Sequence, residues 1–248
     1  MKLDSVRASF DRVGDRGGWD FSKIQSRRGE IPWDYRAVVQ SETPPAARAL
    51  DIGTGGGEYL LEMAAFFSSV VGIDPDPEMI AVATSNAQKS GIANVSFQKG
   101  SADELPFSGN TLDFAMNRQA PFNLQEIARV LRPGGVFVTQ QVGIRNLENI
   151  VAPFGGQAFP ENAIPSTARR TALQVGLVVD RLDEYDTEYR YLNLDSLVFQ
   201  LKAISHYLLH PVSGDSGMTK LLEAARVSSD GRGQFISNEH RWLMVAHK

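Results

Sequence analysis

Cysteine, histidine and long apolar runs are absent or scarce in this sequence. There is no cysteine, and there are four histidines among 248 residues. The lack of cysteine excludes disulfides, thiolate catalysis and zinc sites with cysteine ligands. No stretch approaches the roughly 18 apolar residues that cross a bilayer, and residues 1–7 lack the apolar run of a signal peptide. We therefore expect a cytoplasmic protein that binds no metal and does not enter the membrane.

Positive charge is not in excess either. The chain has 25 Lys and Arg against 29 Asp and Glu, a net charge of −4. Proteins that bind a nucleic-acid backbone need clustered Lys and Arg, so this balance argues against such a partner. We interpret the pairs Arg27-Arg28 and Arg169-Arg170 as solvated surface. A chain of this length and 42% hydrophobic content can bury a full core as one large α/β domain or two small ones.

From residue 47 onward, short apolar segments alternate with segments of helical periodicity. This alternation is typical of a parallel sheet whose strands are joined by right-handed crossovers. The expected strands cover residues 49–52, 70–73, 95–98, 112–116 and 136–142, with further strand material at 177–182, 189–192 and within 234–246. The expected helices begin near residue 58 and cover 77–89, 124–131, 167–176, 194–209 and 217–227, with a short one near 146–152.

Residues 1–44 differ from the rest because aromatic side chains are scattered there among charges and no strand is evident. The aromatic residues are Phe10, Trp19, Phe21, Trp33 and Tyr35. A helix is expected within residues 30–39, with Pro32 near its first turn. Two roles fit these aromatic residues equally well: packing of the segment onto the main domain, or a lid over a substrate pocket.

A glycine-rich turn after the first strand is the clearest sign of a ligand site. Residues 49–61, ALDIGTGGGEYLL, read as a short strand, a glycine turn and the start of a helix. The turn contains Gly53, Gly55, Gly56 and Gly57. Glycine lets the backbone adopt positive φ and approach a bulky ligand, and the helix that follows directs free N–H groups toward it. Asp51 adds a carboxylate beside the turn.

Two classes of ligand use such a turn. A dinucleotide site needs the pattern G-x-G-x-x-G, in which the third glycine lets a pyrophosphate rest on the helix. The third position here is Glu58, whose carboxylate repels a pyrophosphate but suits a ligand with an ammonium or sulfonium group. The pattern D-x-G-x-G-x-G over residues 51–57 resembles the first motif of the class I S-adenosylmethionine-dependent methyltransferases. One such match alone is also compatible with a glycine turn that binds nothing.

Three later segments support this resemblance. Asp74 ends the second strand, where a carboxylate can accept both ribose hydroxyls, although dinucleotide sites share this feature and Asp74 can also cap a helix. Residues 100–107, GSADELPF, look like the methyltransferase segment that recognises adenine, with Asp103 as the acceptor for its amino group. Residues 126–135, EIARVLRPGG, resemble the E-x-x-R-V-L-x-P-G-G signature of the small-molecule and quinone-type (methyltransferase type 11-like) enzymes.

The resemblance implies a fold and a cofactor. The expected fold is α/β and Rossmann-like, a doubly wound, mostly parallel sheet of seven strands with an antiparallel last strand and an N-terminal helical lid. We expect one domain over residues 1–248, with a helical cap at 1–44, a cofactor-binding half at 45–142 and a substrate-side half with inserted helices at 143–248. The implied cofactor is S-adenosyl-L-methionine, which becomes S-adenosyl-L-homocysteine. Its predicted contacts are Asp51, Gly53, Thr54, Gly55, Gly57, Asp74, Pro75, Met79, Ser101, Ala102, Asp103 and Asn117.

The methyl acceptor is expected beyond the carboxyl ends of the strands, where ligands of open α/β sheets bind. The residues predicted to contact it are Trp33, Arg118, Gln119, Gln141 and Tyr207. Arg118 can pair with an anionic group or simply lie in solvent, and both interpretations stay open. His206 and His210 are candidate general bases, although a histidine on a helix is more often structural. Their spacing, without a third ligand, does not make a metal site.

The sequence therefore predicts an enzyme that transfers a methyl group from S-adenosylmethionine to an O, N or C atom of a small molecule. An in-line displacement needs mainly alignment, and it needs a base only for a poorly acidic or protonated acceptor. One alternative is an NAD(P)-dependent Rossmann oxidoreductase, which Glu58 and the absence of a Tyr-x-x-x-Lys pair disfavour. Another is a catalytically idle cofactor-binding protein. We expect a monomer or homodimer with no membrane partner. The overall charge disfavours a nucleic-acid partner, but RNA and protein acceptors stay open because a local basic pocket is compatible with it, and the sequence does not identify the acceptor.

Overall fold

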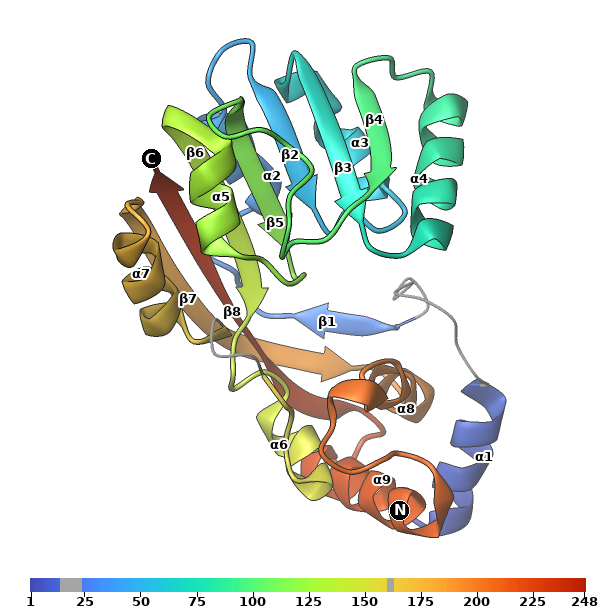
Figure 1. Cartoon of the computed structure of the whole chain (residues 1–248). Coiled ribbons are helices and arrows are strands. Elements are labelled where there is room, and N and C mark those ends of the chain that lie inside the picture. The colour runs from blue at the N-terminus through green and yellow to red at the C-terminus, as the bar shows by residue number, and fades with distance from the viewer. Residues whose placement is uncertain (14–23, 160–162) are drawn as a thin grey trace. The chain divides into compact units, whose positions relative to one another are not determined.

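The computed structural model describes residues 1–13, 24–159 and 163–248 (Figure 1). Trp19 and Phe21 lie outside these residues. The helices are α1 (Leu3–Val13), α2 (Tyr35–Glu42), α3 (Glu58–Met63), α4 (Pro77–Ser90), α5 (Leu124–Val130), α6 (Glu148–Val151), α7 (Pro165–Gln174), α8 (Leu194–Ala203) and α9 (Gly214–Ser228), with 3-10 turns η1 (Ala64–Phe66), η2 (Ala152–Phe154) and η4 (Ser205–Tyr207). The strands are β1 (Ser26–Arg28), β2 (Arg48–Ile52), β3 (Ser69–Asp74), β4 (Val95–Lys99), β5 (Leu112–Arg118), β6 (Leu131–Val142), β7 (Val178–Tyr191) and β8 (Phe235–His247).

The strands form one mixed sheet in the order β1-β7-β8-β6-β5-β2-β3-β4. The pairs that join β4, β3, β2, β5 and β6 are all parallel. Gly134 N–H donates to the Lys248 carbonyl at 2.7 Å and Lys248 N–H donates to the Gly135 carbonyl at 3.0 Å, so the end of β8 lies beside the start of β6. The last strand is therefore antiparallel. The prediction of a mostly parallel α/β sheet with an antiparallel last strand is confirmed.

The sheet has eight strands, whereas the sequence predicted seven. The additional strand is β1, whose residue Ser26 pairs with Tyr191 of β7 in an antiparallel ladder. The prediction of no strand in residues 1–44 was wrong because the sequence SRR has no apolar alternation and the ladder forms through the backbone. β7 is also one continuous strand, where two separate segments were predicted. The helix predicted within residues 30–39 is α2, which begins at Tyr35 because the Asp34 carboxylate accepts the Ala37 N–H at 2.8 Å and caps the helix there.

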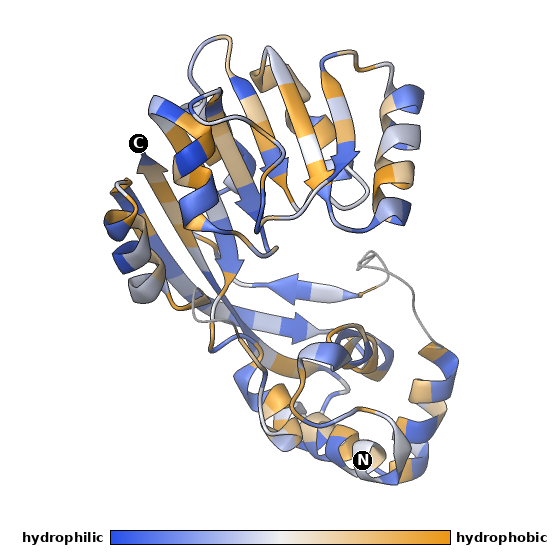
Figure 2. Ribbon diagram, in the orientation of Figure 1, coloured by the Kyte–Doolittle hydropathy of each residue, from blue (hydrophilic) through white to orange (hydrophobic). Residues whose placement is uncertain are grey.

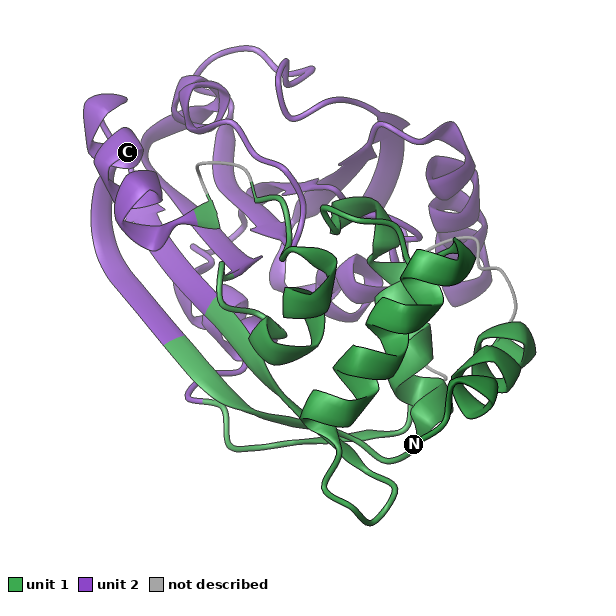
Figure 3. Ribbon diagram, turned by 90° about the horizontal axis from the view of Figure 1, so that it is seen from below, with its two compact units in different colours: residues 1–31, 143–163, 185–241 green, residues 32–142, 164–184, 242–248 purple. Residues whose placement is uncertain are grey.

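The chain forms two compact units (Figure 3). Unit 1 comprises residues 1–31, 143–163 and 185–241, and unit 2 comprises residues 32–142, 164–184 and 242–248. The predicted division at residues 44 and 142, within a single domain, stays a prediction. Among the described residues, no helix combines the length and the apolar character that a bilayer crossing requires.

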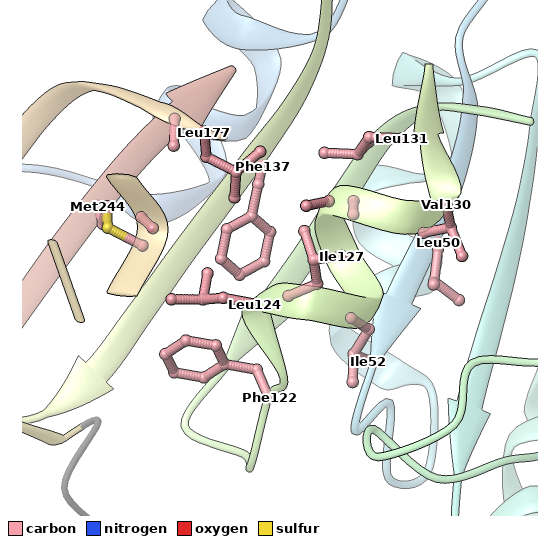
Figure 4. Close-up of a cluster of buried hydrophobic side chains, with 14 of the residues drawn as sticks. Leu50, Ile52, Phe122, Leu124, Ile127, Val130, Leu131, Phe137, Leu177 and Met244 are labelled. Carbon is pink, nitrogen blue, oxygen red and sulfur yellow. The ribbon is translucent and has the colours of Figure 1, made fainter. Parts of the chain in front are cut away.

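Each unit has its own apolar core. In unit 2, Phe122 and Leu124 lie beside Phe137 of β6 (Figure 4), and all six residues from Leu112 to Asn117 in β5 are buried. Figure 2 shows β3 mostly in hydrophobic colours, as expected for a parallel strand covered on both faces. In unit 1, apolar side chains of α1, α8 and α9 meet at Val6, Leu197 and Leu221. Each large side chain buried in this way contributes about 1.5–3 kcal/mol, so each core can hold its own elements together.

Candidate functional site

The glycine turn lies in unit 2, between β2 and α3. Gly53, Gly55 and Gly57 have φ angles of +78°, +54° and +76°, a region that favours glycine. A Cβ on Gly53 would lie 2.3 Å from the Ala120 Cβ, and a Cβ on Gly57 would lie 2.6 Å from the Phe97 ring. A Cβ on Gly55 would meet no described atom within 4 Å. The turn is therefore closely packed at its two ends and open at Gly55.

Asp74 ends β3 beside this open position. Its Oδ2 accepts a hydrogen bond from the Gly55 N–H at 3.0 Å, and its Oδ1 accepts one from the Asp76 N–H at 3.0 Å. A carboxylate oxygen can accept two hydrogen bonds, so both oxygens keep the capacity to bind a hydroxyl. The N-cap of α4 is Asp76, whose Oδ1 accepts the Glu78 N–H at 2.8 Å. Asp74 is thus not needed as the helix cap.

Asp51 is a partly buried carboxylate at the end of β2. Burial raises its pKa from 3.8 to about 6, and the Asp74 carboxylate acts in the same direction. The Thr54 hydroxyl and the Arg118 guanidinium lower the pKa but do not offset the burial. The Arg118 guanidinium lies 4.2 Å from the centre of the Tyr59 ring, a cation–π contact. A carboxylate whose charge is so weakly compensated favours a positively charged ligand beside it.

Asn117 lies fully buried under the turn. Its Nδ2 donates to the Ile52 carbonyl at 2.8 Å and to the Pro121 carbonyl at 3.3 Å. Its Oδ1 accepts from the Thr139 hydroxyl at 3.2 Å and from Gln141 Nε2. The amides of Asn117 and Gln141 therefore fasten β2, β5 and β6 together where these strands end. Their predicted contacts with cofactor and acceptor stay predictions.

Two aromatic residues at the start of α2, Trp33 just before it and Tyr35 at its first position, pack onto the same strand ends within unit 2. Trp33 Nε1 donates to Gln140 Oε1 at 2.8 Å, and the Tyr35 hydroxyl donates to the Asn117 carbonyl at 3.1 Å. Trp33 is 6% exposed and Tyr35 is 4% exposed. Both side chains therefore pack onto unit 2, and the predicted contact of Trp33 with the acceptor stays a prediction. Gln119 follows β5, is exposed and has a φ of +55°.

The segment after β4 forms a tight turn in unit 2. Ser101 and Glu104 face each other in an isolated antiparallel bridge, and the Asp103 N–H donates to Ser101 Oγ at 3.2 Å. The Asp103 residue is exposed, whereas Ala102 packs against the core of unit 2. Two other predicted cofactor contacts lie at the start of α4, where Pro75 is exposed and Met79 is half-buried.

The candidate bases belong to unit 1. His206 and Tyr207 lie in η4, and His210 follows it. The prediction of one helix over residues 194–209 was wrong, because α8 ends at Ala203 and Leu208 is extended, so the two histidines do not share a helix. His206, Tyr207 and His210 are all exposed, and their roles stay predictions. The described residues contain no group of three Asp, Glu, His or Cys residues arranged to hold a metal.

Sequence reasoning missed Asn86 and Tyr59, two residues beside the turn. Asn86 of α4 donates to the Gly56 carbonyl at 2.9 Å and to Glu58 Oε1 at 3.0 Å. The Glu58 carboxylate lies over the turn, since a Cβ on Gly56 would be 2.6 Å from its oxygens. The ring of Tyr59 stacks against the Arg118 guanidinium. The only feature of the sequence that could have pointed to Tyr59 is its position two residues after the glycine turn. Asn86 is distant in the sequence and carried no local signal at all.

Comparison with known proteins decides the family. Residues 44–173, slightly more than half of the chain, match the family model described as a methyltransferase domain. The chain belongs to this methyltransferase family. The family assignment made from the sequence motifs is thereby confirmed.

Named relatives agree with this membership. A Bacillus subtilis protein called uncharacterized methyltransferase YcgJ is 38% identical over 108 residues, which are 41% of this chain and 43% of that protein. A demethylmenaquinone methyltransferase from Symbiobacterium thermophilum is 32% identical over 149 residues, 55% of this chain and 59% of that protein. The chain therefore matches only about half of the length of these curated relatives.

Solved structures share the fold. The crystal structure of YcgJ superimposes with a TM-score of 0.62 at 19% identity, covering 86% of this chain and 97% of that one. The [4+2]-cyclase SpnF superimposes with a TM-score of 0.58 at 20% identity, covering 99% of this chain and 93% of that one. At such low identity these likenesses show the fold alone, and the reaction has to be argued from the site.

Proposed function

We propose that this protein is an S-adenosylmethionine-dependent methyltransferase that acts on an O, N or C atom of a small molecule. The observation that carries this proposal is the arrangement at the glycine turn. Gly55 is open on the side where a Cβ would lie, its N–H is bonded to Asp74, and Asp51 is a carboxylate with a pKa raised to about 6. Membership of the methyltransferase family supports the same conclusion.

The residues present fit the chemical groups of this cofactor. Both Asp74 oxygens can accept one more hydrogen bond each, which suits the two ribose hydroxyls. Asp51 suits a positively charged ammonium or sulfonium group, because a nearby cation favours its ionised form. The exposed Asp103 carboxylate can accept the adenine amino group. When bound, the cofactor supplies an activated methyl group, so the protein has mainly to align the acceptor with it.

The oxidoreductase alternative fits the turn less well. A dinucleotide needs room for a pyrophosphate at this position. The Glu58 carboxylate lies over Gly56 instead and is held there by the Asn86 amide at 3.0 Å. A pyrophosphate placed here would be repelled by the negative charge of Glu58. The position of Glu58 therefore supports a cationic cofactor over an anionic one.

One named relative and one side-chain pair support a proposal for the class of acceptor. The Symbiobacterium thermophilum relative is named for demethylmenaquinone, which has an aromatic ring. In this chain the Arg118 guanidinium lies over the Tyr59 ring at 4.2 Å and ends β5. A cation stacked on an aromatic ring suits a planar acceptor with an acidic hydroxyl. We therefore propose a phenolic or quinone-precursor acceptor. His206 and His210 remain the candidate bases.

Calorimetry tests the cofactor part of the proposal. S-Adenosylhomocysteine should bind the wild-type protein at micromolar concentration, and NADH should not bind. The variant Asp74→Ala should weaken binding by at least about tenfold, because it removes both acceptors for the ribose. Asp76→Ala is the matched control, since it removes the cap of α4 at a cost of about 1 kcal/mol but leaves the contact with Gly55. Binding of NADH without S-adenosylhomocysteine would overturn the proposal.

Turnover distinguishes an enzyme from a catalytically idle binding protein. The wild-type protein, incubated with S-adenosylmethionine labelled in its methyl group and a panel of phenols and hydroquinones, should transfer label to at least one of them. Binding of S-adenosylhomocysteine without transfer to any acceptor would favour the idle protein. The cytoplasmic location and the oligomeric state stay predictions.

A further inference from the structure

Two charged residues of the 126–135 signature have no part in the site described so far. Glu126 and Arg129 lie one turn apart on α5 in unit 2. Arg129 Nε donates to Glu126 Oε1 at 2.7 Å, and the second guanidinium nitrogen donates to Oε2 at 2.6 Å. This is a bidentate pair with a fixed geometry.

The pair also binds the backbone of the segment that follows β4. Glu126 Oε2 accepts the Leu105 N–H at 2.8 Å. Arg129 donates to the Leu105 carbonyl at 3.0 Å and to the Phe107 carbonyl at 2.7 Å. Three main-chain groups of residues 105–107 are thus held by two side chains, and the Leu105 side chain is itself buried in the core.

The other end of this segment is attached to β3. The Gly100 N–H donates to the Asp74 carbonyl at 3.1 Å, so the segment begins next to the residue proposed to bind the ribose. Residues 101–104, including Asp103, therefore form a short turn between two anchors. The first anchor is the end of β3, and the second is the Glu126–Arg129 pair.

The residue types explain why the anchor is rigid. The planar guanidinium of Arg129 can donate to a carboxylate and to two carbonyls at once, which a lysine ammonium on a flexible stem does less well. The hydrogen bond from Arg129 lowers the pKa of Glu126, although burial acts against it. Both side chains are partly exposed, at 17% and 39%, so their attraction alone adds little stability. What the pair supplies is the position of the backbone.

We propose that Glu126 and Arg129 are positioning residues that hold Asp103 at the distance needed to recognise the 6-amino group of adenine. This inference rests on the proposed function, because it assumes that the turn at residues 101–104 contacts the base of the cofactor. In this inference the pair acts on the ligand only through the backbone of residues 105–107. It determines how strongly the protein prefers a 6-amino purine over a 6-oxo purine.

The same signature contains a matched control. Arg132 Nε lies 2.6 Å from Asp113 Oδ1, and Asp113 Oδ2 accepts the Arg48 N–H at 2.7 Å. As in the Glu126–Arg129 pair, one carboxylate here binds both an arginine and a backbone N–H. It lies at the starts of β2 and β5, whereas the glycine turn follows the end of β2. Arg132→Ala should therefore lower stability without changing recognition of the base.

The test compares two ligands, S-adenosylhomocysteine and its 6-oxo analogue S-inosylhomocysteine, by calorimetry. The wild-type protein should prefer the amino ligand. Arg129→Ala should weaken binding of the amino ligand about tenfold and leave the oxo ligand within about twofold, and Arg129→Lys should fall between. Glu126→Gln keeps an acceptor for the Leu105 N–H and can be used if Arg129→Ala does not fold. In Glu126→Gln the preference for the amino ligand over the oxo ligand should fall a few-fold. Arg132→Ala should keep the full preference.

An unchanged ratio in Arg129→Ala and Glu126→Gln would overturn the inference, as would an equal loss in Arg132→Ala. If the proposed function itself is wrong, the wild-type protein will bind neither ligand. That outcome can be told apart from an unchanged preference in the variants.

Discussion

Glu239 of unit 1 and Asp51 of unit 2 are carboxylates that differ in how far nearby groups compensate their negative charge. In unit 1, Glu239 is 7% exposed and accepts the Tyr185 hydroxyl at 2.5 Å and an Arg28 nitrogen at 3.1 Å. Burial acts to raise its pKa, but Arg241, Tyr185 and Arg28 outweigh burial, and the pKa is lowered overall. In unit 2, burial raises the pKa of Asp51 to about 6 because nearby groups do not offset it. The compensated carboxylate supports the fold, whereas the uncompensated one suits a ligand.

The largest effect is expected at Glu239. Glu239→Gln should lower the free energy of unfolding by about 3 kcal/mol, because it removes the buried negative charge that faces the guanidinium groups of Arg241 and Arg28. Urea denaturation near pH 7 measures this loss. The control is Glu188→Gln, whose partner Arg190 lies 2.8 Å away but whose side chain is 52% exposed; it should change stability by less than about 0.5 kcal/mol.

The same variant tests the separation of roles between the two carboxylates. Its affinity for S-adenosylhomocysteine should stay within about twofold of the wild-type value. The sign of the pH effect is fixed by the lowered pKa of Glu239. Its contribution to stability is present above the pKa of the unfolded chain and is lost as the pH falls through the lower folded value. Equal stability losses in Glu239→Gln and Glu188→Gln would show that burial does not distinguish these pairs.

At Asp51 the expected change has the opposite sign. Asp51→Asn should raise the free energy of unfolding near pH 7 by about 2 kcal/mol without ligand, because it removes the cost of burying an ionised carboxylate. The raised pKa means that the wild-type protein loses stability as the pH rises from about 4 to about 6, and the variant should not. Thermal unfolding at these pH values measures the difference. The variant should also bind S-adenosylhomocysteine at least about tenfold more weakly. A variant that is less stable than the wild type would contradict this account of Asp51.

The two carboxylates also show what could be predicted from the sequence. Asp51, Gly55 and Asp74 were predicted because each lies at a strand end or in a turn that a short stretch of sequence defines. The network of Glu239 was not predicted, because its partners come from β1, β7 and β8, and alternating polar residues there look like a solvated face. Arg28 was interpreted as solvated surface and is indeed exposed, but nothing in the sequence indicated that its guanidinium also pairs with Glu239 at 3.1 Å.

The signature at residues 126–135 illustrates a second limit. Its letters indicated the family, and the family model confirmed it. The pattern itself gave no indication that Glu126 and Arg129 bind the backbone of residues 105–107, since those residues lie on a different element. Contacts within a turn follow from spacing, but contacts between a helix and a loop depend on packing that local pattern does not encode.

The smallest change in stability is expected for substitutions of Arg118. These substitutions also test whether Asp51 controls the pH dependence of binding. The Arg118 guanidinium lowers the pKa of Asp51, so Arg118→Gln should raise that pKa above 6. Binding of S-adenosylhomocysteine, measured by calorimetry from about pH 5 to pH 8, should weaken in the wild-type protein as Asp51 becomes protonated below about pH 6. In Arg118→Gln this midpoint should move to higher pH, whereas Arg118→Lys, which keeps the charge, should stay near the wild type. The lost cation–π contact with Tyr59 should cost only about 0.5–1 kcal/mol of stability. Because Asp51→Asn should show no midpoint at all, a midpoint that stays fixed in Arg118→Gln would mean that another group controls the binding.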